Sequence, residues 1–322
     1  MKKALVFGGS GHCGSYLVPR LVDMGYEVHS VSRGVREPYT CDMPQWAEVQ
    51  KHVLDRRSAE DRDAAGQMAV KIAPDVICDL ISYTKEEMEG LMEPILARPA
   101  LAEKMHIVQV GTVWVYGVKL AVPVTEEHPR NSTDGYGIGK AAIEKYLHGL
   151  SAEGKIKSTV IFPGHISGRG WVPINPQGHV NIEVYRDIKA GKPVLIPDDG
   201  NHTLHHVHSA DIAALIGVCL ANPDKSNGET FHATTERAVT MAGFAEALYT
   251  HYGHEPKLEF VRLEELQKKL GANDFVNTTR HMMFSSHCSM EKAKRVLGFT
   301  PAYSTMDTIL DALAWQEENG NL

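Results

Sequence analysis

The chain has 322 residues, enough for two domains or for one large domain with an elaboration. Hydrophobic residues make up 43% and charged residues 23%, a globular composition that excludes wholesale disorder and a fibrous repeat. The net charge of -7 argues against binding to nucleic-acid phosphates, and five cysteines without a C-x-x-C pair favour a reducing compartment. Because no apolar run is long enough for a membrane span, we expect a cytoplasmic protein without nucleic-acid or membrane partners.

Strands and helices alternate through the first half of the chain. Alternation at this interval predicts right-handed βαβ units and a parallel sheet. The expected strands are 4–7, 27–31, 49–54, 75–81, 106–110 and 158–162, and the expected helices between them are 16–22, 59–70, 85–96 and 139–150.

The alternation ends at Gly164, after which glycine and proline are frequent up to Pro197. Helical patterns return at 241–252, 289–297 and 305–318. We therefore expect an α/β fold, a Rossmann-type doubly wound parallel sheet with a smaller, mainly C-terminal α+β substrate lobe. The predicted division is a dinucleotide-binding domain of residues 1–163 and 203–222, and a lobe of residues 164–202 and 223–322.

Gly8, Gly11 and Gly14 form a G-x-x-G-x-x-G pattern between the first strand and the first helix. Glycines at this place allow the backbone to approach a pyrophosphate, which the helix N-terminus stabilises. A purely structural glycine turn is the alternative, and the position at the first strand of a βαβ series favours the cofactor. Cys13 lies in the same turn, where a helix N-terminus lowers a thiol pKa; we favour the alternative of a small side chain packed under the cofactor.

The second strand ends at Ser32 and Arg33, where a carboxylate would select NAD. No acid is present, and Arg33 could form charge-assisted bonds to a 2′-phosphate. The sequence therefore predicts NADP(H) in preference to NAD(H). The alternative is that Arg33 is a solvated loop residue.

Tyr136 and Lys140 are four residues apart, so a phenol and an ammonium share one helical face. A cation beside a phenol lowers its pKa and lets it exchange a proton with a substrate oxygen. An upstream strand delivers the Thr112 hydroxyl to the carboxyl edge of the sheet, where such sheets bind ligands. Together these three residues predict a catalytic site.

Over essentially its whole length the chain resembles an extended short-chain dehydrogenase/reductase, the group that contains the NAD-dependent sugar epimerases and dehydratases. The resemblance rests on the glycine triplet, Asp55, the T-x-x-V-Y-G segment from Thr112, Y-x-x-x-K, and the tail 294–301. It implies a homodimer, with Tyr136 as the acid–base residue, Lys140 lowering its pKa and holding the nicotinamide ribose, and Thr112 orienting the substrate oxygen. It also implies that Asp55 meets adenine and that Pro163 lies beside the nicotinamide. The full expected cofactor set is Gly8, Gly11, His12, Cys13, Gly14, Ser32, Arg33, Asp55, Leu80, Ile81, Lys140 and Pro163.

One departure from the family concerns dehydration. Sugar dehydratases of the family carry an Asp-Glu pair directly after the threonine, where this chain has Val113 and Trp114. Without a carboxylate to remove and return a proton, elimination of that kind is disfavoured.

A second departure concerns the substrate's diphosphate. Family members that act on nucleotide sugars carry an arginine four residues before a histidine; if His208 is that histidine, Leu204 takes the arginine's place. An apolar side chain cannot bind phosphate, so we favour a smaller or uncharged hydroxylated substrate unless Arg169, Arg237 or Arg280 supplies the charge.

Seventeen histidines invite a metal hypothesis, and four of them crowd together at 202, 205, 206 and 208. No metal-ligand spacing such as H-E-x-x-H occurs, so no metal is expected. His165 follows the strand end that faces the nicotinamide, where its imidazole either meets a substrate hydroxyl or forms a local hydrogen bond. Trp114 and Trp171 are the expected substrate-binding aromatics; like Tyr185, they could equally belong to the core.

Three functions are compatible with these residues. The first is an NAD(P)-dependent oxidoreductase that interconverts a secondary alcohol and a ketone on a polar, sugar-like small molecule. The second is a redox-neutral epimerase of a sugar or a nucleotide sugar that keeps its cofactor bound. The third is a non-enzymatic NADP(H)-binding redox sensor, which the presence of Tyr136, Lys140 and Thr112 disfavours.

Overall fold

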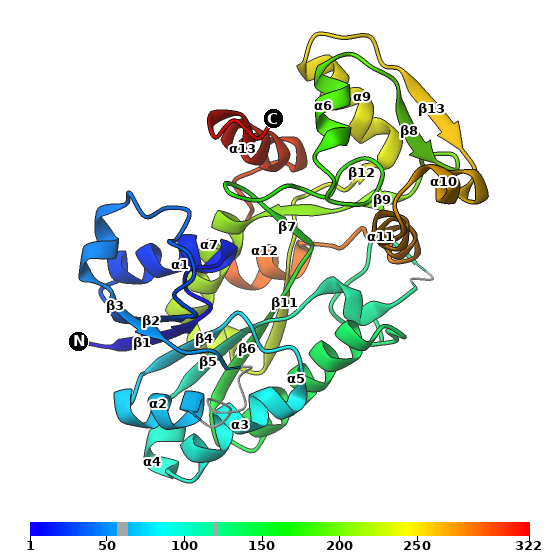
Figure 1. The fold of residues 1–322 in the computed structure, drawn as a ribbon. Helices are drawn as coiled ribbons and strands as arrows, with labels where there is room; N and C mark the ends of the chain where they lie inside the picture. Colours follow the sequence, from blue (N-terminus) through cyan, green and yellow to red (C-terminus); the bar gives the residue numbers. More distant parts are fainter. Residues whose placement is uncertain (57–63, 119–120) are drawn as a thin grey trace.

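Seven parallel strands form the central sheet in the computed structural model, which describes residues 1–56, 64–118 and 121–322. Their order is β11-β6-β5-β4-β1-β2-β3, so the winding direction reverses between β1 and β4 (Figure 1). This confirms the predicted doubly wound α/β fold. The strands are β1 (Lys3–Phe7), β2 (Glu27–Ser32), β3 (Gln50–Val53), β4 (Val76–Asp79), β5 (His106–Val110), β6 (Lys157–Pro163) and β11 (Glu229–Ala233).

Burial explains why the central strands are nearly continuous apolar runs. All residues of β4 and β5 are buried, as are residues 4–7 of β1. Both faces of a parallel sheet are covered, so its central strands need apolar side chains on both sides. At the edge, β3 exposes Gln50, Lys51 and Val53, as expected for a strand with one neighbour.

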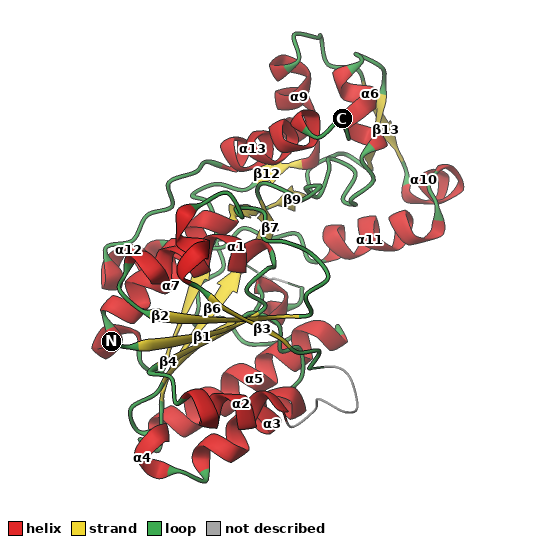
Figure 2. Ribbon diagram, turned by 60° about the vertical axis from the view of Figure 1, so that its left-hand side comes forward, coloured by secondary structure: helices red, strands yellow, loops and turns green. Residues whose placement is uncertain are grey.

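Helices cover both faces of the sheet and make it the middle of three layers (Figure 2). Each face has its own apolar core, one under α1 and α7 and the other under α2, α3 and α5. On the first face lie α1 (His12–Asp23), α7 (Ser209–Ala221) and α12 (Glu291–Leu297), with the short α8 (Pro223–Ser226). On the second lie α2 (Ala64–Ile72), α3 (Lys85–Leu96) and α5 (Gly135–Ala152), with the short α4 (Pro99–Ala102).

The lobe has a third apolar core, in which Tyr185, Leu204 and Phe244 are fully buried. Its helices are α6 (Glu183–Lys189), α9 (Met241–His251), α10 (Leu263–Lys269), α11 (Ala272–Met283) and α13 (Thr305–Glu318). Three small two-stranded sheets pair β7 (His165–Ser167) with β10 (His206–His208), β9 (Thr203–Leu204) with β12 (Val239–Thr240), and β8 (Val194–Pro197) with β13 (Leu258–Val261).

Two buried polar groups join the lobe to the sheet. The Asp211 carboxylate, at the start of α7, accepts hydrogen bonds from the amides of Ala302 and Tyr303 at 2.9 and 3.1 Å. His208 Nε2 lies 3.1 Å from a carboxylate oxygen of Asp311 on α13. Both contacts hold the C-terminal segment against the carboxyl edge of the sheet.

Two details differ from the sequence predictions. The range 223–322 was assigned to the lobe, yet β11 within it pairs with β6 and completes the central sheet. The predicted helix 139–150 begins at Gly135, because the Asp134 side chain accepts the Tyr136 amide and caps an additional turn. The remaining domain boundaries stay a prediction, and residues 59–63 of the predicted helix 59–70 lie outside the described residues.

No helix in the described ranges combines the length and the apolarity that crossing a membrane requires. All five cysteines are free thiols.

The glycine turn gives a stability prediction. A Cβ on Gly14 would lie 2.6 Å from the carbonyl carbon of Gly9, so Gly14→Ala should lower the free energy of unfolding by about 1–3 kcal/mol. The control is Gly149→Ala in α5, where an added Cβ meets no neighbouring atom within 4 Å, and which should raise stability by about 0.5–1 kcal/mol. Urea denaturation measures both; a Gly14→Ala protein as stable as wild type would contradict the tight turn.

Candidate functional site

The turn between β1 and α1 requires glycines because the backbone folds tightly and touches the next strand end. Gly8 has a φ of 89°, and its carbonyl accepts the Gly11 amide at 3.0 Å. A Cβ on Gly8 would lie 2.6 Å from Cγ2 of Ile81, which follows β4. The fold thus brings predicted cofactor residues from two strand ends together at the N-terminus of α1.

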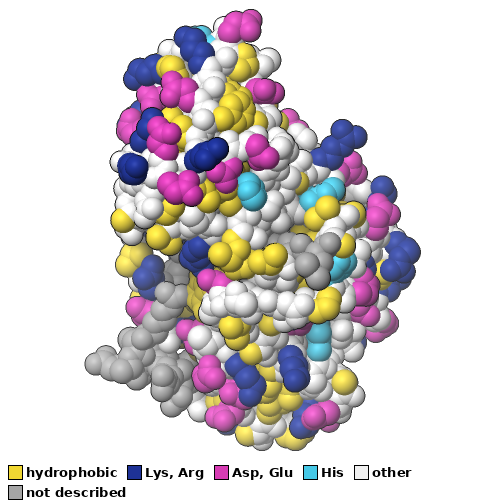
Figure 3. Space-filling view, turned by 90° about the vertical axis from the view of Figure 1, so that its right-hand side faces the viewer, with side chains coloured by type: hydrophobic (Ala, Val, Ile, Leu, Met, Phe, Trp, Pro, Cys, Tyr) yellow, Lys and Arg dark blue, Asp and Glu magenta, His cyan; other side chains and the backbone are white. Residues whose placement is uncertain are grey.

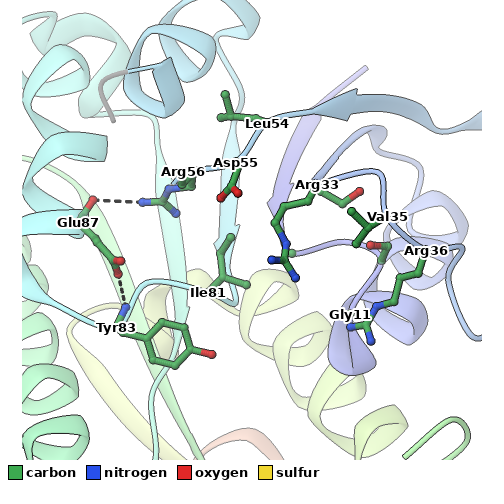
Figure 4. A pocket seen from close by; sticks show the side chains of 13 residues that line it. Gly11, Arg33, Val35, Arg36, Leu54, Asp55, Arg56, Ile81, Tyr83 and Glu87 are labelled. Atoms are coloured by element: carbon green, nitrogen blue, oxygen red, sulfur yellow. Dashed lines mark hydrogen bonds between the residues drawn. The ribbon is translucent and has the colours of Figure 1, made fainter. Parts of the chain in front are cut away.

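A cavity of about 250 Å³ lies beside this turn at the carboxyl edge of the sheet (Figure 4). Arg33 and Arg36 reach it from the loop after β2, Asp55 from the segment after β3, and Tyr83 from the opposite wall. A crevice at the point where the strand order reverses is the usual ligand site of an open α/β sheet. Of the predicted cofactor residues, Gly8, Gly11, Ser32, Arg33, Asp55 and Ile81 line it.

Arg36 was missed in the sequence analysis. Its Nη1 donates to the Tyr39 hydroxyl at 2.8 Å, and its Nη2 lies 3.8 Å from the place of a Cβ on Gly11. The guanidinium therefore lies over the glycine turn. A second arginine three residues after Arg33 was the signal that could have identified it.

Arg56 and Asp79 form a buried ion pair under the cavity, which was also missed. Arg56 Nη1 donates to Asp79 Oδ2 at 2.8 Å, and Asp79 also accepts hydrogen bonds from the Ser82 amide and hydroxyl. Burial alone would raise the pKa of Asp79, but Arg56 and these donors hold it below its usual value. The charge of Arg56 is thereby compensated, whereas no described carboxylate forms an ion pair with Arg33 or Arg36.

The three predicted catalytic residues meet at the carboxyl end of β5. Tyr136 lies in the first turn of α5, and its amide donates to Asp134 Oδ1 at 3.0 Å. One turn later Lys140 is only 2% exposed, and its ammonium donates to the carbonyls of Ser82 and Val110 at 2.7 and 2.6 Å. Lys140 Nζ lies 5.9 Å from the centroid of the Tyr136 ring, so both groups face one space.

Burial raises the pKa of Tyr136 to about 12; Tyr83 adds to the shift, and a hydrogen bond with Thr112 opposes it. Burial also lowers the pKa of Lys140 to about 8. The Lys140 ammonium donates to two carbonyls, and desolvation dominates the pKa of Tyr136; a lowering of that pKa by Lys140 stays a prediction. At neutral pH the phenol is protonated and can donate.

Aromatic rings flank Tyr136 on two sides. The ring centroids of Tyr83 and Trp114 lie 5.7 and 6.2 Å from that of Tyr136, and Lys140 Nζ lies 4.9 Å from the Tyr83 ring. Trp114 also contacts His281 of the lobe helix α11 at 5.3 Å. The predicted Trp114 is therefore next to the acid–base residue, and Tyr83, missed earlier, closes the side toward the cofactor cavity.

Pro163 ends β6, and His165 begins β7 two residues later. His165 Nδ1 accepts the His205 amide at 3.1 Å, and its ring lies 5.1 Å from the ring of His281. The local hydrogen bond expected as one alternative for His165 is present. A role of His165 in substrate binding stays a prediction.

Trp171 and His12 are in contact near the glycine turn. Their ring centroids are 3.5 Å apart, and Tyr39 lies 4.6 Å from the His12 ring. Trp171, predicted to bind substrate, thus lies against a predicted cofactor residue.

Burial raises the pKa of Cys13 to about 12, which agrees with the packed alternative for that thiol.

Two of the crowded histidines, His205 and His206, are buried and bonded locally. His205 Nε2 donates to the Thr235 carbonyl at 2.8 Å, and His206 Nε2 donates to the Ile174 carbonyl at 3.1 Å. Within the described ranges, no group of three or more His, Cys, Asp or Glu side chains is arranged to hold a metal ion.

Leu204 is fully buried in the apolar core of the lobe. Two of the arginines that could take the place of the family arginine form ion pairs: Arg169 with Glu318 at 3.0 Å, and Arg280 with Asp134 at 2.6 Å. Arg237 lines a different cavity. No uncompensated arginine next to Tyr136 is found among these candidates.

Comparison with known proteins places these features in a family. A family model described as "NAD dependent epimerase/dehydratase family" matches residues 4–233. The chloroplast stem-loop binding protein of 41 kDa b from Arabidopsis thaliana is 26% identical over 317 residues, covering 97% of this chain and 78% of that protein. A UDP-glucose 4-epimerase from Lacticaseibacillus casei is 23% identical over 334 residues, covering 98% and 96%.

Among solved structures, the UDP-glucose 4-epimerase of Thermotoga maritima with UDP-glucose superposes with a TM-score of 0.72 at 20% identity. The match covers 98% of this chain and 99% of that one. At this identity the likeness concerns the fold.

The buried ammonium gives a pH prediction. As the pH rises through about 8, Lys140 loses its proton, so the affinity for NADH or NADPH should fall by about tenfold if the ammonium holds the cofactor ribose. Fluorescence titration of both cofactors between pH 6.5 and 9 measures this. Lys140→Met should bind weakly without a step near pH 8, whereas Lys145→Met, on the exposed side of the same helix, should keep the step. A wild-type affinity that does not change across this range would contradict the assignment.

Proposed function

The chain belongs to the NAD-dependent epimerase/dehydratase family, and we propose that it transfers hydride between a nicotinamide cofactor and a carbinol or ketone carbon of a polar, sugar-like molecule. It is an enzyme of the short-chain dehydrogenase/reductase superfamily. The observation that carries the proposal is the meeting of Thr112, Tyr136 and Lys140 at one strand end, beside the glycine-turn cavity.

The residues at the cavity fit a dinucleotide. The glycine turn leaves free the space that a Cβ on Gly11 would occupy, and Arg36 lies directly beyond it. The first amides of α1 and Arg36 would hold the pyrophosphate, Asp55 the adenosine end and Lys140 the nicotinamide ribose. When bound, the cofactor supplies the hydride acceptor or donor.

Tyr136 handles the proton of the reacting oxygen. In the reductive direction the substrate carbon gains a hydride and its oxygen gains the proton of the Tyr136 hydroxyl, with the Thr112 hydroxyl as a second hydrogen-bond partner. Because the pKa of Tyr136 is raised to about 12 by burial, the phenol carries its proton at neutral pH. The protonated phenol is the form that reduction of a ketone requires, and the reverse oxidation requires the phenolate.

The charge of the cavity supports NADP(H) as the preferred cofactor. Arg33 follows β2 directly, where the 2′ position of the adenosine ribose lies in this fold, and Arg36 follows it closely. Both guanidinium groups lack a described carboxylate partner, and the nearby Arg56 is compensated by Asp79. A 2′-phosphate would supply the missing negative charge.

The cofactor preference is tested by comparing two arginines of the same loop. Arg33→Ala should weaken NADPH binding by about 10- to 100-fold and leave NADH binding nearly unchanged, because only NADPH carries the 2′-phosphate. Arg36→Ala should weaken both cofactors, since it lies over the turn that holds the pyrophosphate. Calorimetry of wild type and the two variants measures all six affinities, and tighter binding of NADH than of NADPH by wild type would contradict the preference.

The proposed substrate class rests on two arginines that are already in ion pairs. Leu204, in the place of a family arginine, is buried, and Arg169 and Arg280 are in ion pairs with Glu318 and Asp134. A substrate diphosphate would need at least one of those pairs to break. We therefore favour a free hydroxylated molecule, such as a sugar or a sugar acid, over a nucleotide sugar.

A redox-neutral epimerase is the second candidate, and the UDP-glucose 4-epimerases among the relatives favour it. The same residues would serve both reactions, since the epimerase returns the hydride to the opposite face of the carbon. The two differ in cofactor exchange: a reductase releases its oxidised cofactor after each turnover, whereas an epimerase retains it through purification.

Stem-loop binding, stated in the name of the Arabidopsis relative, is not adopted for this chain. Binding to nucleic-acid phosphates needs a positive surface, and the chain has a net charge of -7. On the face shown in Figure 3, Lys and Arg side chains alternate with Asp and Glu. A small-molecule substrate fits this surface better, and a homodimer remains a prediction.

Turnover tests the role of Tyr136. Stabilisation of the NADPH-loaded protein by free sugars, sugar acids and nucleotide sugars identifies a substrate through its shift of the melting temperature. With that substrate, Tyr136→Phe should reduce kcat at least 100-fold because the proton donor is lost, while cofactor affinity stays within about twofold. Tyr146→Phe, which alters a phenol further along the same helix, is the control and should keep most of the activity. Unchanged turnover in Tyr136→Phe would remove this residue from the mechanism.

A further inference from the structure

One carboxylate connects the lobe to the first turn of the catalytic helix. Asp134 Oδ1 accepts the Tyr136 amide at 3.0 Å, while Oδ2 of the same group accepts Arg280 Nη2 at 2.6 Å. Arg280 belongs to α11, near the C-terminal end of that lobe helix. A single side chain, that of Asp134, therefore links α11 to the backbone of Tyr136.

A second contact joins the same arginine to the ring of Tyr136. The guanidinium carbon of Arg280 lies 4.9 Å from the centroid of the Trp114 ring, and the Trp114 ring meets the Tyr136 ring edge-on at 6.2 Å. The Trp114 amide donates to the Thr112 hydroxyl at 3.2 Å. Arg280 is thus linked to the Tyr136 amide through Asp134. Through Trp114 it is linked to the Tyr136 ring and to the Thr112 hydroxyl.

We propose that Arg280 is a positioning residue for Tyr136, which couples the seating of α11 to the geometry of the acid–base group. This inference rests on the proposed role of Tyr136. The Asp134 carboxylate makes two contacts: Oδ1 caps α5, and Oδ2 accepts from Arg280. The ion pair therefore restrains the carboxylate that caps α5 as well as the position of α11. Displacement of a reacting group by about 1 Å is enough to reduce a rate by about 100-fold, so such a contact has consequences for catalysis.

Variants of Arg280 and Asp134 distinguish a positioning role of Arg280 from direct binding of substrate by Arg280. If Arg280 binds an anionic substrate, removing its competitor Asp134 should free the guanidinium and strengthen substrate binding. If Arg280 positions Tyr136, removal of either partner should have the same effect, and removal of both should add little. Asp134→Asn is the informative variant, because asparagine caps a helix as well as aspartate and removes only the charge.

Hydrogen exchange of the NADPH-loaded full chain, followed by mass spectrometry, tests the proposal without a substrate. Arg280→Gln and Asp134→Asn should each speed exchange of the first amides of α5 by about tenfold, and the double variant should resemble either single one. Arg280→Lys should restore part of the protection, because it keeps the charge but not the planar group over Trp114. Arg169→Gln removes another exposed arginine pair of the lobe and should leave these amides unchanged.

Unchanged exchange in Arg280→Gln would overturn the proposal, and so would an equal acceleration in Arg169→Gln, which would indicate general loosening of the lobe. With the substrate found by the stability screen, the positioning role predicts that Arg280→Gln and Asp134→Asn both lower kcat more than they raise KM. A rise in KM confined to Arg280→Gln would overturn it in favour of substrate binding. Failure of the proposed chemistry is a separate result, since it appears as normal turnover in Tyr136→Phe.

Discussion

The site depends on a buried cation. Lys140 carries a charge into the interior between α5 and the sheet, where an unsolvated ammonium is costly. Its hydrogen bonds to the carbonyls of Ser82 and Val110 offset that cost; Ser82 lies in the segment after β4, and Val110 is the last residue of β5. The requirement to satisfy one ammonium therefore fixes α5 against two strand ends. Tyr136, one turn earlier on the same helix, is held in place by the same contacts.

The parallel sheet explains why distant residues meet at this place. Every strand ends at the same edge, so the segments after β1, β2, β3 and β4 all line one crevice. Asp79 shows how the edge is stabilised: it accepts bonds from the Ile81 and Ser82 amides and pairs with Arg56 from the neighbouring segment. The carbonyl of Ser82 is then available to Lys140. The lining of the cavity and Lys140 are thus joined through the hydrogen bonds of Asp79 and Ser82.

Local patterns in the sequence were sufficient for most of this architecture. The strand 106–110 and the helices 85–96 and 305–318 were predicted with the bounds that the structure shows, because their apolar periodicity and caps are local. Arg33, at the end of the second strand, was predicted for the same reason, whereas Asp55 followed from the family resemblance. The contacts that were missed join distant positions: Arg56 and Asp79 are 23 residues apart, and Arg280 and Asp134 are 146 apart. Neither pair has a local signature, since an ion pair depends on how the chain folds back. The raised pKa of Tyr136 has no signature in the sequence, because desolvation is a property of the packed site.

The lobe's own polar groups argue for an uncharged substrate on separate grounds. Beside α11, a buried loop presents the amides of Asn175 and Gln177 and the ring of His179, which hydrogen-bond to one another. Burial lowers the pKa of His179 and His281, so both rings are neutral near pH 7. Neutral donors and acceptors match hydroxyl groups, whereas a diphosphate requires fixed positive charge. The same burial keeps these histidines neutral, and Arg280 is paired with Asp134, so these lobe groups add no fixed positive charge to that of Lys140 beside Tyr136.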